Sequence, residues 1–248
     1  NTTASYNTAV GASALVANTT GAKNTAVGYL ALTTATTASF NTAVGAYAAD
    51  ALSTGTNNTA VGLQALSTAT TSDNNTAVGF QSLLVNTTGA SNVAVGAGAL
   101  DANTTANHNV GIGAVALGVN TTGTQNVAVG SLTLDANTTA DNNTGLGYAA
   151  LGANTTGTAN TASGMNSMNI NTTGDYNVAM GAGSLQQNTT ADYNTAVGYS
   201  ALLANTTGAG NVAVGALALD ANTTASNNTG LGYAALTANT TGTSNVAV

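Results

Sequence analysis

The side chains that could carry acid–base chemistry are few and scattered along the chain. His108 is the only histidine, Lys23 is the only basic residue, and there is no cysteine or glutamate. The eight acids are all aspartates: Asp50, Asp73, Asp101, Asp135, Asp141, Asp175, Asp192 and Asp220. Catalysis needs titratable groups that converge in one site. We therefore predict that the protein is not an enzyme, with no catalytic residue, no cofactor-binding residue and no cofactor.

Modification of asparagine is a second kind of chemistry that the sequence allows. The sequence N-T-T is a sequon for N-glycosylation, and glycans would help a chain with only 4% charged residues to stay in solution. An alternative interpretation is that Asn and Thr simply make a good turn, copied along with a repeat. The candidate glycosylation sites are Asn1, Asn18, Asn86, Asn103, Asn120, Asn137, Asn154, Asn171, Asn188, Asn205, Asn222 and Asn239.

These residues recur because the chain is a tandem repeat. Asparagine begins the motif at Asn7 and returns every 17 residues, without insertion, as far as Asn245. With that asparagine as position 1, the consensus is N-[TV]-[AG]-V-G-x-x-A-L-x-x-N-T-T-[GA]-x-x. We expect residues 1–248 to be a single continuous repeat array, and a segment of a longer fibre.

The repeat favours strands over helices. The N-T-A-V-G segment has a β-branched alternation, and the glycine that closes it opposes a helix. We predict two short strands per repeat, at positions 2–4 and 6–9, with glycine at position 5 bending the chain. N-T-T-G is a turn in which Asn and Gly tolerate positive φ. The fold class is then all-β: a parallel β-solenoid, or β-roll, with one 17-residue repeat per coil.

The interior of such a coil must be narrow. Val at position 4, as in Val10, and Leu at position 9, as in Leu15, should supply its bulk, because Ala and Gly fill most copies of positions 3, 5 and 8. Position 6 is often aromatic, as in Tyr29 and Phe80, which suggests packing between chains. We therefore expect self-association, as a homotrimer or a filament.

Stacked coils place each position above the same position of the next repeat, and a slip of one residue would turn core side chains outward. The recurring Asn and Thr then form ladders that can hydrogen-bond along the axis. Stabilisation is the simplest role for these ladders. An ice-binding solenoid that displays Thr ladders is an alternative, but adjacent threonines on an extended strand point to opposite faces. A carbohydrate-processing β-helix is a third interpretation, but this sequence lacks the clusters of acidic and aromatic residues that such an enzyme needs.

The repeat also decides against a metal site. The aspartates occur only at positions 10 and 16, and neighbouring copies usually carry no acid. The G-G-x-G-x-D pattern of calcium-binding solenoids is absent. His108, at position 17, is expected to be a solvated turn residue. We predict no metal-binding residue.

Charge excludes two classes of partner. The net charge is −7 and Lys23 is the only base, whereas phosphate groups are bound by clustered Lys and Arg. We therefore expect no nucleic-acid partner. No run of 18 apolar residues occurs, so we expect no membrane insertion of this segment.

The motif N-T-A-V-G-x-x-A-L resembles the YadA-type head repeats of trimeric autotransporter adhesins. The longer NTAVG…AL…NTTG form is similar to repeats in bacterial surface proteins and phage tail fibres. The resemblance covers residues 7–248 and implies a left-handed β-roll, a homotrimer, and a place on a cell or virion surface. We therefore predict a structural or adhesive extracellular fibre segment, with a host-surface or matrix receptor as a possible partner. The alternatives are a phage tail-fibre shaft and an ice-binding solenoid.

Overall fold

The computed structural model describes residues 3–248, and within that range it contains short strands and turns but no helix. Two compact units follow each other along the chain, residues 1–125 and 126–248. The first unit contains β1 (Thr8–Val10), β2 (Thr25–Val27), β3 (Thr42–Val44), β4 (Thr59–Val61), β5 (Thr76–Val78), β6 (Val93–Val95) and β7 (Val110–Ile112). The second unit contains β8 (Val127–Val129), β9 (Thr144–Leu146), β10 (Thr161–Ser163), β11 (Val178–Met180), β12 (Thr195–Val197), β13 (Val212–Val214), β14 (Thr229–Leu231) and β15 (Val246–Ala247).

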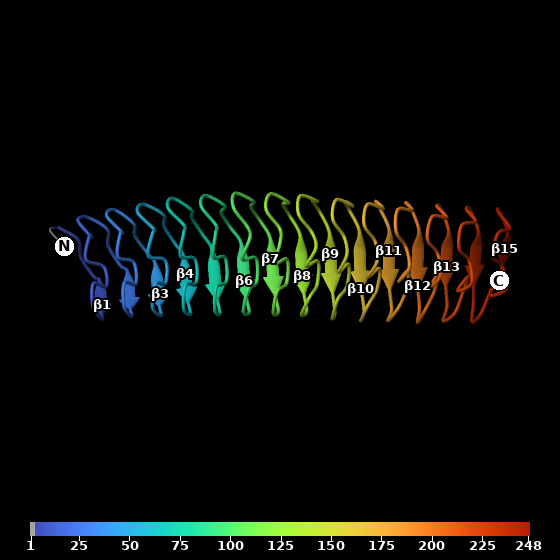
Figure 1. Ribbon diagram of the computed structural model, residues 1–248, viewed down its shortest axis with the longest axis horizontal. Coiled ribbons are helices and arrows are strands. Elements are labelled where there is room, and N and C mark those ends of the chain that lie inside the picture. Colours follow the sequence, from blue (N-terminus) through green and yellow to red (C-terminus); the bar gives the residue numbers. More distant parts are fainter. Residues whose placement is uncertain (1–2) are drawn as a thin grey trace. The chain divides into compact units, whose positions relative to one another are not determined.

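Within each unit, every strand pairs in parallel with the strand of the next repeat (Figure 1). The register is one full repeat: Val10 pairs with Val27, and Val27 pairs with Val44. Each repeat therefore forms one coil, and the coils stack without slip. This confirms the predicted fold class, a parallel β-solenoid with one 17-residue repeat per coil. The left-handed sense of the coil stays a prediction.

The second strand predicted in each repeat, at positions 6–9, is wrong, because these residues lie in turns. Positions 7 and 9 adopt positive φ angles, as at Leu30 (59°) and Leu32 (49°), and an L-residue in that region cannot continue a strand. The hydrogen bonding between coils nevertheless continues through the turn. The N–H of Leu30 donates to the carbonyl of Ala12 (3.0 Å), and that of Leu32 donates to the carbonyl of Ala48 (3.1 Å).

The N-T-T-G turn also differs in detail from expectation. The positive φ angles expected there occur instead at position 17, as at His108 (60°). The glycine at position 5 is the residue whose conformation requires glycine. At Gly28 the φ angle is 138°, and a Cβ atom would stand 2.4 Å from the carbonyl oxygen of Gly45 in the next coil. A side chain at this position would therefore push adjacent coils apart.

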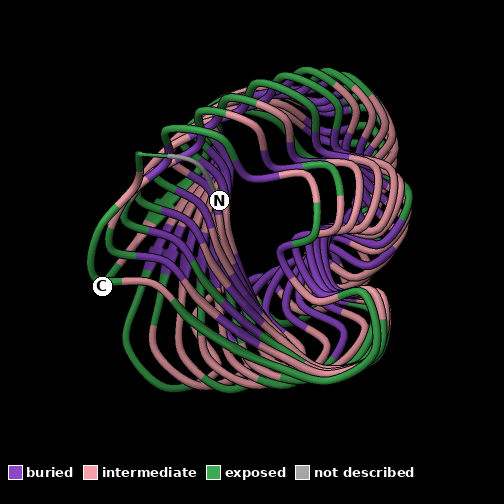
Figure 2. Ribbon diagram, turned by 90° about the vertical axis from the view of Figure 1, so that its left-hand side faces the viewer, coloured by how far each residue is buried: buried purple, intermediate pink, exposed green. Residues whose placement is uncertain are grey.

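The core is built from small residues and one large apolar residue per coil, which is leucine in nearly every coil. Ala26 (position 3), Ala31 (position 8) and Leu32 (position 9) are fully buried, and the pattern repeats along both units. Figure 2 shows the buried residues along the inner side of the coils. The assignment of Val at position 4 to the core is wrong. Because a strand alternates its faces, burial of Ala26 turns Thr25 and Val27 outward.

One coil exchanges two of its side chains. The Asn41 coil (41–57) carries Ala49 at position 9, where the other coils carry leucine or, once, methionine, and Leu52 at position 12, where most carry asparagine. Both residues are buried, with exposed fractions of 1% and 0%. The leucine therefore enters the same narrow interior from the opposite side of the coil, which keeps the interior filled.

Candidate functional site

The asparagines at position 1 lie in the interior and join the coils. The backbone N–H of Asn24 donates to Oδ1 of Asn7 (2.8 Å), and Nδ2 of Asn24 donates to the carbonyl oxygen of Ala38 (2.7 Å). Ala38 is position 15 of the same coil, so this amide also closes the coil on itself. Asn41 repeats both bonds, to Asn24 (2.9 Å) and to Gly55 (2.9 Å). The predicted asparagine ladder is therefore present as a buried, two-way hydrogen-bond network.

The asparagines of the N-T-T sequons form a second interior file. Nδ2 of Asn86 donates to the carbonyl oxygen of Gly89 (2.9 Å), the same atom that receives Nδ2 of Asn75 (2.9 Å). Along the axis, Nδ2 of Asn103 donates to Oδ1 of Asn86 (3.0 Å). One inward-pointing carbonyl therefore accepts two side-chain amides, one from each file.

Most of the sequon asparagines do not face solvent, as an accessible glycosylation site would. Ten of them are at most 1% exposed: Asn18, Asn86, Asn103, Asn120, Asn137, Asn154, Asn171, Asn188, Asn205 and Asn222. In the folded coil their amide nitrogen, the atom to which a glycan attaches, points into the protein. A glycan attached before folding would prevent the coil from closing. Asn239 is half-buried, and Asn1 lies outside the described residues.

The two threonines of the sequon have different environments. At position 13 the hydroxyl bonds along the axis, as from Thr87 to the carbonyl of Thr104 (3.1 Å). At position 14 the threonines, such as Thr71 and Thr88, are exposed in every coil. Positions 13 and 14 therefore do not form one flat row of threonines. This agrees with the alternation of an extended chain, in which adjacent side chains point to opposite faces.

The aspartates accept hydrogen bonds from neighbouring coils. Asp73, at position 16, accepts the backbone N–H of Thr56 (2.6 Å) and its hydroxyl (2.9 Å). Asp192 accepts the N–H of Asp175 (2.8 Å) in the same way. At position 10, Asp50 accepts the hydroxyl of Ser67 (2.7 Å). These carboxylates therefore accept hydrogen bonds from backbone N–H groups and hydroxyls in the turns of adjacent coils.

Two aspartates at position 10 have carboxyl groups with a raised pKa. Burial raises the pKa of the carboxyls of Asp101 and Asp135, and hydrogen bonds from backbone amides oppose that shift. Asp101 belongs to the first unit and Asp135 to the second.

The histidine and the lysine lie on the surface. His108 is exposed and its backbone N–H bonds to Ala90 (3.2 Å), which confirms the prediction of a solvated turn residue. The ammonium of Lys23 lies 5.0 Å from the ring centroid of Phe40. Among residues 3–248 no group of three His, Cys, Asp or Glu side chains could hold a metal ion. In the same range, no helix is long and apolar enough to cross a membrane.

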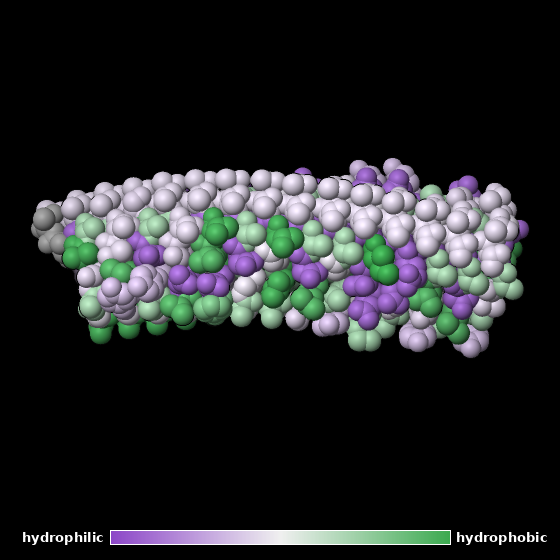
Figure 3. All heavy atoms as spheres, in the orientation of Figure 1, coloured by the Kyte–Doolittle hydropathy of each residue, from purple (hydrophilic) through white to green (hydrophobic). Residues whose placement is uncertain are grey.

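The first and third residues of each strand, at positions 2 and 4 of the repeat, point outward and form a surface that we call the outer sheet face. In the first unit all of them are Thr, Val or Ile, in two files that run from coil to coil. Several are exposed, for example Val44 (37%) and Met180 (48%). On the face that Figure 3 turns to the viewer, hydrophobic residues are interspersed with hydrophilic ones. The aromatic residues at position 6, such as Tyr199 (63% exposed), stand beyond the glycine that ends each strand.

The sequence contained a signal for the buried asparagines that the turn interpretation missed. Where position 12 is not asparagine it is Ala35, Leu52 or Ala69, and all three are small or apolar. A solvent-exposed turn would tolerate charged residues there. The restriction to Asn, Ala and Leu is typical of an interior position.

No model of a known protein family matches this chain, and no curated protein matches it.

Proposed function

We propose that this chain is a structural or adhesive segment of an extracellular fibre, carried on a cell or virion surface, without catalytic turnover. The observation that carries the proposal is the use of the recurring polar residues. The asparagines at positions 1 and 12, the threonines at position 13 and the aspartates at position 16 bond to their own coil or to adjacent coils. Such a chain devotes its polar chemistry to holding a stack of coils in register.

The mechanical consequence supports a fibre. Each coil contacts only its neighbours, so stability is a sum over coils and interfaces, and length can be extended by adding repeats. Because backbone hydrogen bonds continue around the turns, separating two coils requires breaking bonds on every side of the coil. This is the property that a load-carrying shaft or an adhesive head needs.

The outer sheet face supports self-association, and its occupant is a second copy of the chain. Two files of β-branched residues at a constant axial spacing are complementary to themselves, because every coil offers the same shape. Exposed apolar side chains such as Val44, Leu146 and Met180 are also those that monomers rarely leave in water in a continuous strip. The trimer itself comes from the resemblance to adhesin heads, and a phage tail-fibre shaft is compatible with the same geometry.

Native mass tests this assembly. The chain has a mass of 23.7 kDa, so a trimer would have about three times that value. Val61→Asp with Val95→Asp places charges on the outer sheet face and should shift the native mass to that of one chain. Thr71→Asp with Thr105→Asp adds the same charges to the same two coils at exposed position 14, and should leave the oligomer intact. A wild-type chain that is monomeric at high concentration would remove the assembly from the proposal.

Ice binding is a second candidate, and the outer sheet face is the observation that favours it. In the first unit this face is entirely β-branched, and such side chains are stiff at χ1, so they form a regular array. Thermal hysteresis at micromolar protein concentration would identify this function. Thr59→Tyr should then abolish the hysteresis, while Thr71→Tyr, on the other surface of the same coil, should preserve it.

A further inference from the structure

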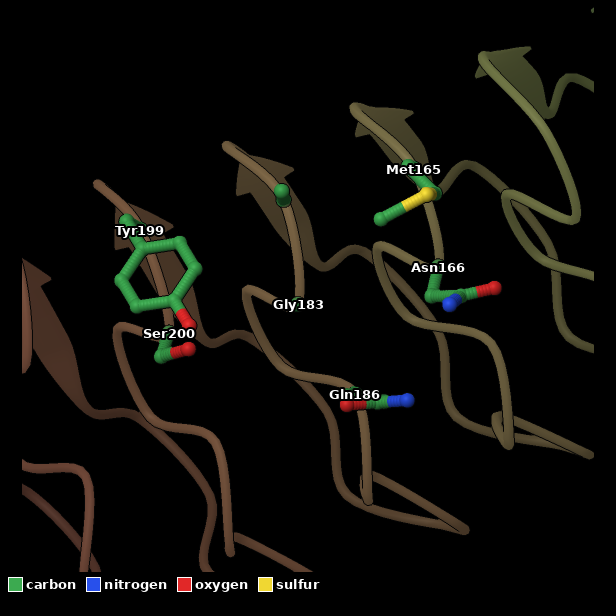
Figure 4. A pocket seen from close by; sticks show the side chains of 7 residues that line it. Met165, Asn166, Gly183, Gln186, Tyr199 and Ser200 are labelled. Carbon is green, nitrogen blue, oxygen red and sulfur yellow. The ribbon is translucent and has the colours of Figure 1, made fainter.

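In the second unit, a surface depression of about 150 Å³ lies over Ala182 and Gly183, the residues at positions 6 and 7 of their coil. Its two walls come from the coils before and after. Figure 4 shows Met165 on one side of Gly183 and Tyr199 on the other. Both walls stand out from the surface, with 57% of Met165 and 63% of Tyr199 exposed. The depression exists because the intervening coil carries no large side chain at either position.

The distance between the walls suits one flat ring. Adjacent coils are spaced like adjacent strands, about 4.8 Å apart, so the walls are about 9.6 Å apart along the axis. A ring above Ala182 would stand one coil away from each wall. Rings on adjacent coils of this protein are close enough to stack. The rings of Tyr176 and Tyr193, at position 17 of successive coils, are parallel within 1°, and their centroids are 5.3 Å apart. A ring above Ala182 could therefore stack on Tyr199 in the same manner.

Polar atoms converge on the floor of the depression. Oγ of Ser200 lies 3.4 Å, and Oε1 of Gln186 3.7 Å, from the point where a side chain at Gly183 would begin. Asn166 adds a carboxamide at the rim (Figure 4). Within residues 3–248 the side chains of Gln186 and Asn166 form no hydrogen bond with other protein groups. They are thus available to a ligand as donors and acceptors.

We propose that this depression binds one pyranose ring of a neutral glycan, stacked on Tyr199 with its hydroxyls bonded to Gln186, Ser200 and Asn166. A pyranose has apolar C–H faces and hydroxyls around its edge, which matches apolar walls and a polar floor. If the occupant were an aromatic side chain of a partner protein, the carboxamides of Gln186 and Asn166 would be left without hydrogen-bond partners, which would weaken binding. No charged group lines the depression, so an acidic sugar gains nothing, and a nucleotide would be repelled by a chain with net charge −7. The inference gives the adhesive role proposed above a ligand, and its biological setting rests on that role.

A similar pair of small residues in the first unit shows why two walls matter. Ala97 and Gly98 occupy positions 6 and 7 of their coil, with Phe80 at position 6 of the preceding coil. The following coil has Ala114 at position 6, so a second wall is missing. Asp101, a carboxylate, takes the place of Gln186. This site should bind a neutral pyranose much more weakly.

Saturation-transfer difference NMR on the full chain tests the proposal with the methyl pyranosides of glucose, galactose, mannose and N-acetylglucosamine, and with glucuronate and phenol as comparison probes. We expect saturation of at least one neutral pyranoside, with weak, millimolar binding. Tyr199→Ala should reduce affinity at least tenfold. Ala182→Tyr should abolish binding, because its ring fills the depression. Ala46→Tyr, the same change at position 6 in the first unit, should leave binding unchanged.

Three outcomes would overturn the proposal: no pyranoside binds the wild-type chain, phenol binds in preference to every sugar, or Ala182→Tyr and Ala46→Tyr have equal effects. Native mass, measured on the same samples, separates this result from the fibre proposal. If Ala182→Tyr changes the oligomer and Ala46→Tyr does not, the depression is a contact between copies, and the sugar site is wrong. Loss of sugar binding with an unchanged oligomer supports the site independently of assembly.

Discussion

Three successive coils of the first unit carry Ala35, Leu52 and Ala69 at position 12, whereas the coil that follows them carries Asn86. In the Asn41 coil the carbonyl of Gly55, at position 15, accepts one side-chain amide, from Asn41 (2.9 Å). In the Asn75 coil (75–91) the corresponding carbonyl accepts two amides. Both kinds of coil have a strand at the same positions, the same register and the same buried alanine at position 3.

The difference shows that the two asparagine files are not equivalent. The position-1 asparagine closes its own coil through Nδ2 and receives the next coil through Oδ1, as Asn41 does with Gly55 and with the N–H of Asn58 (2.8 Å). The position-12 asparagine adds a second bond to a carbonyl that already has one. A coil can therefore form without the second file but needs the first, which agrees with asparagine at position 1 in every copy of the repeat.

The largest effect is expected for Asn41→Ala, in a coil with no asparagine at position 12. The change leaves two buried groups without partners, the carbonyl of Gly55 and the N–H of Asn58. At about 1–3 kcal/mol for each unsatisfied group, we expect local stability to fall by about 4 kcal/mol. Hydrogen exchange of the amides in residues 41–58 measures this loss.

Asn75→Ala is the matched comparison for this variant. Here the carbonyl of Gly89 keeps the amide of Asn86 (2.9 Å), and only the N–H of Asn92 loses its acceptor. The expected loss is about 2 kcal/mol. Equal losses for Asn41→Ala and Asn75→Ala would contradict the idea that the second file supports the first.

A smaller effect is expected for Asn86→Ala. The carbonyl of Gly89 keeps the amide of Asn75 (2.9 Å), and Nδ2 of Asn103 keeps the carbonyl of Ala106 (3.1 Å). No buried group is left without a partner, so the loss should be about 1 kcal/mol, the net value of a hydrogen bond. Thermal unfolding followed by circular dichroism, beside Asn75→Ala, makes the comparison. A larger loss for Asn86→Ala than for Asn75→Ala would reverse the order of the two files.

The fold was predictable because a 17-residue period without insertions leaves little freedom in stacking. Burial of Leu at position 9 and of Ala at positions 3 and 8 followed from the same period. The orientation of the strand did not follow, because both of its faces are apolar and the larger residue was assigned to the interior. Size variation is the missed signal: position 3 is always Ala or Gly, while position 4 includes Val10, Ile112, Ser163 and Met180. The interior has room for no side chain larger than a methyl group at position 3, so residue type is restricted there, whereas position 4 faces outward and can vary in size.

The turns were less predictable than the strands. Leucine is not a residue expected at positive φ, yet Leu15 and Leu32 adopt it at 52° and 49°. Burial of the leucine side chain and hydrogen bonds to the next coil outweigh an unfavourable local conformation, and a single repeat considered alone contains neither. For the same reason the depression over Ala182 could not be predicted, since its walls come from residues 17 positions away on either side.

The smallest effect, and the only gain, is expected for Ala69→Asn. This change adds the second amide to the last of the three coils that lack it. The carbonyl of Ser72 already accepts Nδ2 of Asn58 (2.8 Å), and the new Nδ2 would share it, as Asn86 shares Gly89 with Asn75. The new Oδ1 would in turn accept Nδ2 of Asn86, extending the second file by one coil.

We expect Ala69→Asn to stabilise this coil by at most about 1 kcal/mol, because each new bond replaces one that the unfolded chain makes with water. Ala69→Ser is the control, since its hydroxyl is too short to reach the carbonyl of Ser72 and should give no gain. Slower hydrogen exchange in residues 58–75 for the Asn variant alone would support the two-file arrangement. Destabilisation by Ala69→Asn would show that Leu52, in the preceding coil, occupies the space that the new amide needs. The second file would then end at Asn86 because of packing rather than because its bonds are weak.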